Sequence, residues 1–204
     1  MIIEINDQNI DSRLVDDVVQ ILKKGGLIVF PTDTVYSVGC DLYNKKALQK
    51  LARFKDVKLQ KANFSLICFD LSDLSKYVKH IDRSTYKLLN KSLPGPFTFI
   101  LNATNEIPRR FDSNKKEVGI RIPDNNIARA IVETLGNPMA STSLHNEDEI
   151  KEYFSDPLAI YENHDMDFDL IIDGGPGNLD ASTIIDCTSG DPEIVRQGRG
   201  EIIL

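Results

Sequence analysis

The sequence predicts an α/β protein, in which helices pack on a twisted, open sheet of mixed parallel and antiparallel strands. Two observations support this fold class. Short apolar runs alternate irregularly with amphipathic helical segments, and in several places two apolar runs follow each other with no helix between them. Such pairs indicate a mixed sheet covered by helices rather than a regular doubly wound one. The 204 residues fit one domain with a sizeable core, and we expect that domain to span residues 1–204.

Helices are expected wherever apolar side chains recur at intervals of three or four residues. The pattern is clearest over residues 11–24, where Leu14, Val18 and Leu22 are four residues apart and Gly25 can end the helix. Asn44 can cap the next helix, which would carry lysines on its outer face. This second helix covers residues 45–54, and the remaining predicted helices cover residues 72–77, 82–90, 126–135 and 147–154.

Strands are expected at the apolar runs that turn residues separate. In chain order they cover residues 27–30, 35–40, 64–69, 97–101, 118–122, 139–143, 169–172, 182–186 and 193–195. A Pro-Gly-Pro sequence at 94–96 stops helix formation, and a Gly-Gly-Pro-Gly sequence at 174–177 makes a turn. The fourth and fifth of these strands are predicted to flank a basic loop that contains Arg109, Arg110, Lys115 and Lys116.

Charge is distributed unevenly along a chain whose formal net charge is −7. Seven basic residues lie between positions 44 and 61 against one acid, Asp56, whereas nine acids lie between positions 145 and 170 against one base, Lys151. An acidic chain with one basic segment favours a local anion site over a nucleic-acid coat. A solvated, lysine-rich helix face explains the same segment more simply.

Several kinds of protein are not expected from this sequence. No apolar run reaches the length of a membrane span and the N-terminus has no signal-peptide pattern, so we expect a cytoplasmic protein with no membrane partner. Cys40, Cys68 and Cys187 lie in separate apolar runs and are expected to be buried, free thiols. Histidines and cysteines show no metal-ligand spacing, so no metal site is expected. The common nucleotide-binding, hydrolase and zinc-enzyme motifs are absent.

Polar and basic residues gather at the predicted strand ends. They are Thr32, Thr34, Tyr36, Lys55, Arg121, Ser141, Thr142, Ser143, Ser182, Thr183 and Arg196. Three cations among many hydroxyls, with no obvious general base, are suited to holding a phosphate and a carboxylate, because a guanidinium binds either group through two parallel hydrogen bonds. Such a site would act by positioning and charge stabilisation. Each residue also has a purely structural reading, as an outward strand residue, a turn residue or a core aromatic.

Five segments together carry a resemblance to a known family. They are 31–39 (Pro-Thr-Asp-Thr-Val-Tyr-Ser-Val-Gly), 119–123 (Gly-Ile-Arg-Ile-Pro), 141–143 (Ser-Thr-Ser), 182–186 (Ser-Thr-Ile-Ile-Asp) and 194–198 (Ile-Val-Arg-Gln-Gly). Over nearly its whole length the chain resembles the YrdC/YciO family of L-threonylcarbamoyladenylate synthase-like proteins. Within the family it resembles the YciO branch most, through residues 63–68, 70–77 and 94–111.

The resemblance implies a YrdC-like fold with a concave, positively charged face, and an ATP-dependent reaction. L-Threonine, bicarbonate and ATP, with Mg²⁺, would give threonylcarbamoyl-AMP and pyrophosphate for the threonylcarbamoyladenosine modification of tRNA. The carbamate oxygen would attack the α-phosphate while cations neutralise charge on the phosphate oxygens. Carried over by motif, the threonine pocket would contain Thr32, Tyr36, Arg121 and Ser182. The nucleotide would be held by Lys55, Asn63, Ser141, Ser143 and Arg196, and catalysis would depend on Lys55, Ser143 and Arg196.

Two positions depart from the pattern of the synthases that the chain resembles. Those synthases carry Lys-x-Arg where residues 55–57 read Lys-Asp-Val, and Ser-x-Asn where residues 143–145 read Ser-Leu-His. Val57 cannot replace the two-toothed phosphate contact of an arginine. His145 could donate one hydrogen bond where the amide of an asparagine would both donate and accept. We therefore expect weakened synthase activity.

Two further readings stay open. The first is a translation-associated protein of the same fold that binds double-stranded RNA or tRNA with little catalysis. Its RNA surface would consist of Lys45, Lys46, Lys50, Arg53, Lys58 and Lys61. The second is a related adenylation with a different amino acid. The sequence leaves the oligomeric state open between monomer and homodimer.

Overall fold

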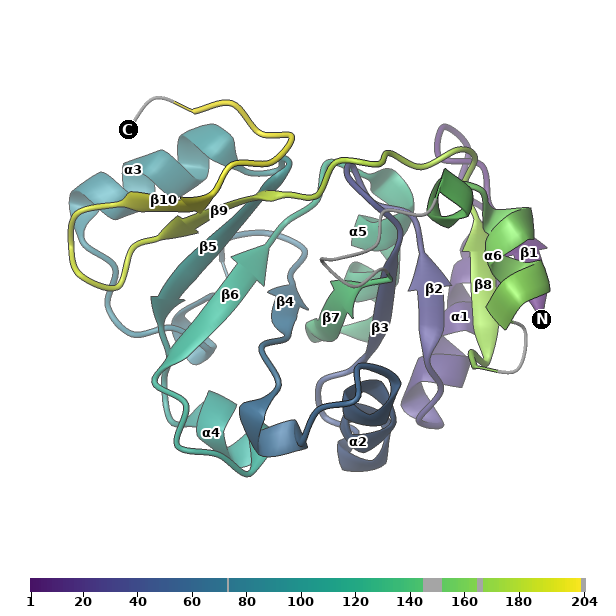
Figure 1. Ribbon diagram of the computed structural model, residues 1–204, viewed down its shortest axis with the longest axis horizontal. Helices are drawn as coiled ribbons and strands as arrows, with labels where there is room; N and C mark the ends of the chain where they lie inside the picture. The colour runs from purple at the N-terminus through teal and green to yellow at the C-terminus, as the bar shows by residue number, and fades with distance from the viewer. Residues whose placement is uncertain (73, 145–151, 165–166, 203–204) are drawn as a thin grey trace.

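A sheet of ten strands forms the frame of the described part of the molecule (Figure 1). The structure, a computed structural model, describes residues 1–204 except 73, 145–151, 165–166 and 203–204. The strand order is β1-β8-β2-β3-β7-β4-β6-β5-β9-β10. The strands are β1 Ile2–Glu4, β2 Ile28–Phe30, β3 Ser37–Asp41, β4 Ser65–Ile67, β5 Phe97–Asn102, β6 Glu117–Arg121, β7 Met139–Ser143, β8 Leu170–Asp173, β9 Thr183–Asp186 and β10 Glu193–Arg196.

The sheet mixes parallel and antiparallel neighbours, as the sequence predicts. Parallel pairs are β1 with β8, β8 with β2, β4 with β6, and β5 with β9. The other neighbours run antiparallel. The antiparallel pair of β2 and β3 follows the break after Phe30, where two apolar runs succeed each other without a helix. The predicted fold class is therefore confirmed.

Helices cover both faces of the sheet, because most of them have one apolar stripe to bury. The α-helices are α1 Ser12–Lys23, α2 Lys45–Phe54, α3 Arg83–Ser92, α4 Glu106–Phe111, α5 Asn126–Leu135 and α6 Pro157–His164, and the 3-10 helices are η1 Leu59–Lys61, η2 Leu74–Lys76 and η3 Glu152–Ser155. Within the described ranges, no helix is both long enough and apolar enough to cross a bilayer.

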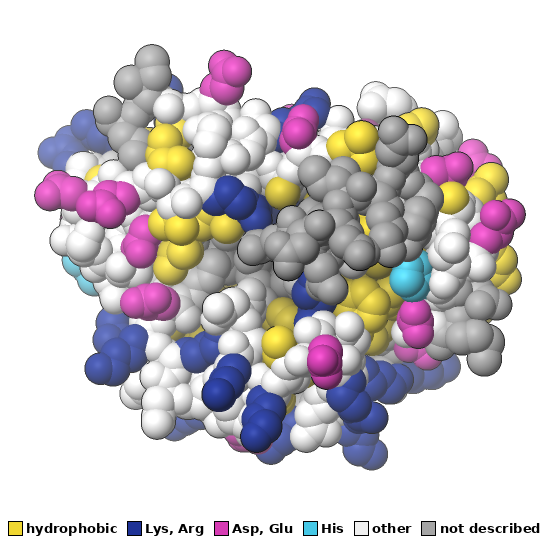
Figure 2. Space-filling model, viewed as in Figure 1, with side chains coloured by type: hydrophobic (Ala, Val, Ile, Leu, Met, Phe, Trp, Pro, Cys, Tyr) yellow, Lys and Arg dark blue, Asp and Glu magenta, His cyan; other side chains and the backbone are white. Residues whose placement is uncertain are grey.

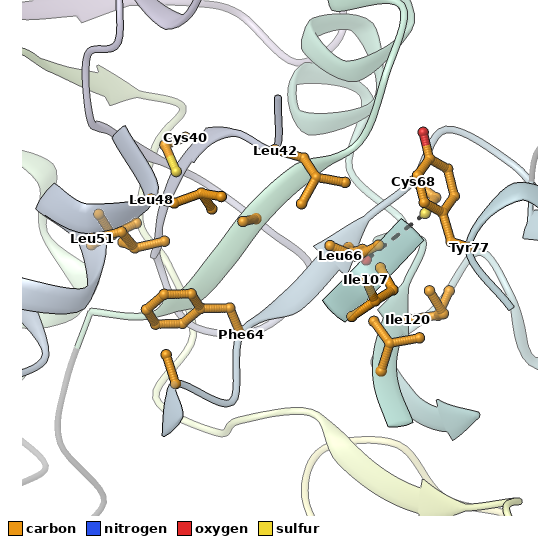
Figure 3. Packing of buried hydrophobic residues seen from close by; sticks show 14 of the residues in the cluster. Cys40, Leu42, Leu48, Leu51, Phe64, Leu66, Cys68, Tyr77, Ile107 and Ile120 are labelled. Atoms are coloured by element: carbon orange, nitrogen blue, oxygen red, sulfur yellow. Dashed lines mark hydrogen bonds between the residues drawn. The ribbon is translucent and has the colours of Figure 1, made fainter. Parts of the chain in front are cut away.

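Two hydrophobic cores lie on opposite faces of the sheet. α1 and α5 pack against each other and form one core with Ile28 and Phe30 of β2. α2 packs on the other face, where Leu48 and Leu51 join a larger core that extends past Leu66 of β4 (Figure 3). Residues that alternate along a strand serve opposite cores, which is the reason for the nearly continuous apolar runs in the central strands.

The predicted ends of α1 and α2 are confirmed. The Asn44 side chain accepts a hydrogen bond from the backbone N–H of Ala47 at 3.1 Å, which caps α2. Gly25 follows α1 with a φ of 87°, the left-handed conformation that glycine adopts without strain. These helix ends could be predicted because each capping residue lies within a few residues of the helix end that it closes.

The structure differs from the prediction where local signals are weak. β1 has three residues and pairs with the distant β8. α4 lies inside the predicted basic loop, and its Pro108 occupies the first turn, where a missing N–H costs no hydrogen bond. The apolar residues of α6 do not share one face, so their spacing gave no helical pattern. The helix predicted at 72–77 is the 3-10 helix η2, and the one at 147–154 lies largely outside the described residues.

All three cysteines are buried and none forms a disulfide, as predicted. Burial raises the pKa of the Cys40 thiol, and it raises the pKa of Cys187 to about 11. Thiolates are the reactive species, so both side chains are protected at neutral pH by burial and by their protonation state.

We predict that the native protein reacts slowly with a thiol reagent such as DTNB at pH 8. After unfolding in guanidinium chloride without reductant, three thiols per chain should titrate. Recovery of one thiol alone would contradict the structure, because it would require a disulfide between two of the three cysteines.

Candidate active site

Small side chains leave a hollow over the central strands β7, β4 and β6. Ser141 lies opposite Ser65, and Ser65 lies opposite Gly119, so these three residues form a row across the strands. A Cβ on Gly119 would lie 2.9 Å from the Ser65 Oγ, so even an alanine there would require Ser65 to shift. Ile67 and Met139 lie two residues away on the same face and belong to the core under α1 and α5. The row of small residues begins where this helical cover ends.

The hollow is a cavity of about 140 Å³ that segments from several parts of the chain line. Six of the nine residues that the family motifs assign to the threonine or the nucleotide meet here: Asn63, Arg121, Ser141, Ser143, Ser182 and Arg196. The other lining residues are Val35, Ser65, Thr98, Thr142, Ala181 and Ile184. The strand order explains this meeting, because β9 lies beside β5 and β5 lies beside β6.

Arg121 lies at the end of β6 with 7% of its surface exposed. Its Nη2 donates to Thr34 Oγ1 at 2.9 Å and to Asp33 Oδ1 at 3.2 Å. Its Nε is buried, and no described residue offers an acceptor within hydrogen-bonding distance of it. A buried guanidinium with an unused N–H in a cavity is a ready donor to an anionic ligand.

Asp33 holds Arg121 from the loop between β2 and β3. The other oxygen of its carboxylate, Oδ2, accepts from the backbone N–H of Asp124 at 3.0 Å, so this loop is tied to the segment after β6. Burial raises the pKa of the Asp33 carboxyl, and the charge of Arg121 opposes that rise only in part. The pair is therefore costly to desolvate, and its contribution is the fixed orientation of Arg121 rather than stability.

Arg196 brings a second guanidinium to the cavity from the edge strand β10. Its Nη2 donates to the Ser182 carbonyl oxygen at 2.9 Å, and the Ser182 hydroxyl lies 2.8 Å from the Thr98 hydroxyl. Burial lowers the pKa of Arg121, the Asp33 carboxylate opposes this, and the charge of Arg196 lowers it further. Arg121 and Arg196 are the charged residues among the described residues that line the cavity, so its surface suits an anion.

Three predicted site residues, Thr32, Tyr36 and Lys55, do not line the cavity. The Thr32 hydroxyl donates to the Val35 carbonyl oxygen at 2.8 Å and so supports the loop that carries Asp33. The fully buried Tyr36 donates to a carbonyl oxygen at 2.7 Å in the turn after β8. Lys55 ends α2. Their contacts with threonine or nucleotide stay predictions.

Of the two residues that depart from the family pattern, the structure describes one. Val57 follows α2 and is 41% exposed. His145 lies outside the described residues. The expected weakening of synthase activity stays a prediction.

The basic residues predicted to bind RNA lie on α2 and in the segment after it. Lys45 forms an ion pair with Asp112 at 2.6 Å, and Lys50 lies 3.7 Å from Asp169 and donates to the Gly25 carbonyl oxygen at 2.9 Å. Intramolecular partners thus engage part of this surface. Figure 2 shows Lys and Arg side chains gathered on the lower part of the molecule, over α2 and α4. Binding of RNA there stays a prediction.

Sequence reasoning missed a second cavity, of about 330 Å³, that adjoins the first. The two cavities share Asn63, Ser65, Thr98 and Ile184. Lys115 lines the second cavity, although the sequence placed it only in a basic loop. The pattern of that loop gave no sign of the cavity, because the facing residues come from other strands.

The fold is α/β, and its cavity is lined by two guanidiniums and a row of hydroxyls, a set of donors that suits an anionic ligand. The sequence profile of the Sua5/YciO/YrdC family, described as "Telomere recombination", matches residues 20–198. The chain therefore belongs to the Sua5/YciO/YrdC family, as its motifs indicate.

Relatives of this chain include uncharacterised proteins and a synthase. The "Uncharacterized protein YciO" of Escherichia coli (strain K12) is 40% identical over 200 residues, which cover 97% of this chain and 95% of that protein. A "Threonylcarbamoyl-AMP synthase" of Coxiella burnetii (strain RSA 331 / Henzerling II) is 29% identical over 138 residues, which cover 68% of this chain and 74% of that protein.

Two solved structures share the fold. The crystal structure of E. coli YciO has a TM-score of 0.88 and 38% identity, and the match covers 98% of this chain and 97% of that one. The crystal structure of P. abyssi Sua5 complexed with L-threonine has a TM-score of 0.86 and 24% identity, and the match covers 97% of this chain and 57% of that one.

We predict that Arg121→Met destabilises the fold by about 3 kcal/mol at pH 7, because Asp33 then stays buried without a cation. Burial already raises the pKa of Asp33 above its ordinary value of 3.8, and loss of the cation raises it further. As the pH falls, the folded state takes up this proton before the unfolded state does, so the variant regains stability. Urea unfolding at pH 7 and pH 5 measures both effects.

The double variant Asp33→Asn/Arg121→Met is the matched control, because it removes both charges and should lose this pH dependence. Lys45→Met, which breaks the exposed ion pair with Asp112, should cost less than about 1 kcal/mol. An equal deficit of Arg121→Met at both pH values would contradict this account, because it would show that the lost stability does not come from the charge of an unpaired Asp33.

Proposed function

We propose that the protein is a synthase that makes threonylcarbamoyl-AMP from L-threonine, bicarbonate and ATP, and that its product serves the threonylcarbamoyladenosine modification of tRNA. The observation that supports this best is the buried Arg121 with an unused N–H, beside Arg196, in a hydroxyl-lined cavity. The 29% identity to the Coxiella synthase adds support. P. abyssi Sua5, which shares the fold, was solved with L-threonine.

In this proposal Arg121 binds the carboxylate of L-threonine. Its Nε donates to the carboxylate, while Asp33 and Thr34 keep the guanidinium plane fixed. The paired hydroxyls of Ser182 and Thr98 lie on the same cavity wall and can hydrogen-bond the other polar groups of threonine. Arginine suits this role because lysine offers no planar fork.

The remaining cavity residues would hold the reacting phosphate. The amine of threonine and bicarbonate form a carbamate with loss of water, and a carbamate oxygen then attacks the α-phosphorus of ATP. The bond from that phosphorus to the bridging oxygen breaks, and pyrophosphate leaves with the electron pair. Arg196, Ser141 and Ser143 donate to the phosphate oxygens on which charge builds up, and Asn63 positions the nucleotide. No covalent enzyme intermediate is needed.

Mg²⁺ would enter this site as its complex with ATP. Among the described residues, no group of three histidine, cysteine or carboxylate side chains converges to hold a metal ion. The buried carboxylate of the site, Asp33, is engaged by Arg121. Mg²⁺ commonly binds through substrate phosphates and water rather than in an all-protein cage, so this donor set fits a metal carried by the triphosphate.

We predict that Arg196→Met lowers threonine-dependent pyrophosphate release by roughly ten- to a hundredfold, because one charge-assisted contact to the phosphate is lost. Arg199→Met is the matched control. Arg199 lies three residues further on, is exposed and donates to Asn178, so its loss should leave the rate unchanged.

The assay supplies ATP, bicarbonate and each amino acid in turn. Release that depends on threonine supports the proposal, and release that depends on another amino acid would change the substrate. A wild type without any amino-acid-dependent release would contradict the proposed reaction.

The basic patch supports RNA binding as a second candidate function, since it lies on one side of the molecule (Figure 2). We predict that retention of tRNA or double-stranded RNA, where it occurs, falls steeply with salt, because phosphate contacts release counterions. Charge reversal at the exposed Lys46, Lys58 and Lys61 should abolish it. Unchanged retention would place the RNA surface elsewhere, with Arg109 and Lys116 the next residues to test.

A further inference from the structure

Thr183, at the start of β9, is a fully buried polar residue that does not line the cavity. Its two neighbours in the chain, Ser182 and Ile184, both line it. Successive side chains of a strand point to opposite faces of the sheet, so the Thr183 hydroxyl lies on the other face. There Thr183 is in register with Phe97 of β5, a residue of the larger core. Thr183 can therefore act on a ligand in the cavity only through other residues.

The Thr183 hydroxyl fastens the turn that follows β10. It donates to the Gly200 carbonyl oxygen at 2.6 Å and accepts from the backbone N–H of Gly198 at 2.9 Å. The Gln197 Nε2 donates to the same Gly200 oxygen at 2.8 Å and lies 3.4 Å from the Thr183 hydroxyl. We call these four residues the latch. The latch holds a segment that begins directly after Arg196.

Gly198 brings this turn into close contact with the backbone before β9. A Cβ on Gly198 would lie 2.3 Å from the Ala181 carbonyl oxygen and 2.7 Å from the Ser182 carbonyl oxygen, so a side chain there would require the backbone to shift. The Ser182 carbonyl oxygen also accepts from the Arg196 Nη2 at 2.9 Å. The turn and the guanidinium thus rest on the same stretch of backbone, and a turn that moved away from β9 would carry Arg196 with it.

Arg196 depends on the latch because β10 ends the sheet in the described part of the chain, where β9 is its single neighbour. The register between the two strands shifts between Ile194 and Arg196. Ile194 and Val195 are 40% and 60% exposed, so little packing holds β10 in place. Ser182 is held more firmly, since β9 also pairs with β5 and the Ser182 hydroxyl lies 2.8 Å from that of Thr98. Loss of the latch would therefore displace Arg196 before Ser182.

We propose that Thr183 is a positioning residue for Arg196 and that Gln197 supports it. This inference rests on the proposed function, in which Arg196 donates to the phosphate oxygens on which charge builds up. A guanidinium stabilises that charge best when it is fixed before the reaction, and a displacement of about 1 Å can cost roughly a hundredfold in rate. Loss of the hydroxyl should therefore lower kcat and leave the KM for threonine, which Arg121 binds, unchanged.

The test measures threonine-dependent pyrophosphate release by variants of Thr183. Thr183→Val keeps the shape of the side chain without its hydroxyl, and we expect kcat to fall about tenfold with the KM for threonine unchanged. Thr183→Ser keeps the hydroxyl and should retain most of the wild-type rate. Thr85→Val is the matched control, because it removes the hydroxyl of another buried threonine, which donates to Asp82 at the start of α3. Its kcat should equal that of the wild type.

Combination with Arg196→Met separates positioning from a purely structural role. If Thr183 acts through Arg196, Thr183→Val should cause no further loss of rate once Arg196 is methionine. A purely structural role predicts that the two losses multiply, and that result would overturn the inference.

Gln197→Met, at an exposed position, allows the same comparison if Thr183→Val does not fold, with an expected fall in kcat of about threefold. A wild-type kcat in both Thr183→Val and Gln197→Met would overturn the inference and leave the proposed function standing. A wild type without threonine-dependent release would contradict the proposed function, and the inference with it.

Discussion

The buried pair of Arg121 and Asp33 is the interaction on which the site depends. It joins residues 88 positions apart, from the end of β6 and from the loop between β2 and β3. Two charges removed from water cost more than their attraction returns, which agrees with the raised pKa of Asp33 and the lowered pKa of Arg121. What the pair gives the protein is a guanidinium held in one orientation, with Nε left for a ligand.

The sheet places the other parts of the site around this pair. Small residues on β7, β4 and β6 leave room above the strands, and β9 and β10 carry Ser182 and Arg196 to the same place from the end of the chain. The guanidinium of Arg196 adds a second positive charge to the cavity, and the adjoining cavity extends the hollow beyond it. A site with fixed donors and no nucleophile in the reaction path would catalyse by positioning and by stabilising charge on phosphate.

The sequence predicted the fold class and most central elements, because their signals are local: apolar periodicity, the Asn44 cap and the Gly25 turn. It did not reveal β1, whose partner β8 is about 170 residues away in the chain. Six site residues meet as the motifs indicated, although periodicity alone could not have brought Arg121 and Ser182 together.

The sequence also could not show whether a polar side chain lines a cavity or makes its contacts elsewhere in the fold. Tyr36 stands in the motif beside Thr34, yet its hydroxyl lies against the turn after β8 and not in the cavity. In the sequence Lys115 is one of four cations in a basic loop, whereas the fold places it in one cavity with Phe64 and Phe111. In both cases the partner belongs to a distant segment, so the outcome depends on tertiary structure.

A crystal structure of the protein with L-threonine and a non-hydrolysable ATP analogue tests the central claim most directly. The account predicts the threonine carboxylate within hydrogen-bonding distance of the Arg121 Nε, with the ion pair to Asp33 intact and Arg196 on the phosphates. Ligands bound outside the cavity, or an Arg121 whose Nε remains without an acceptor in the complex, would contradict it.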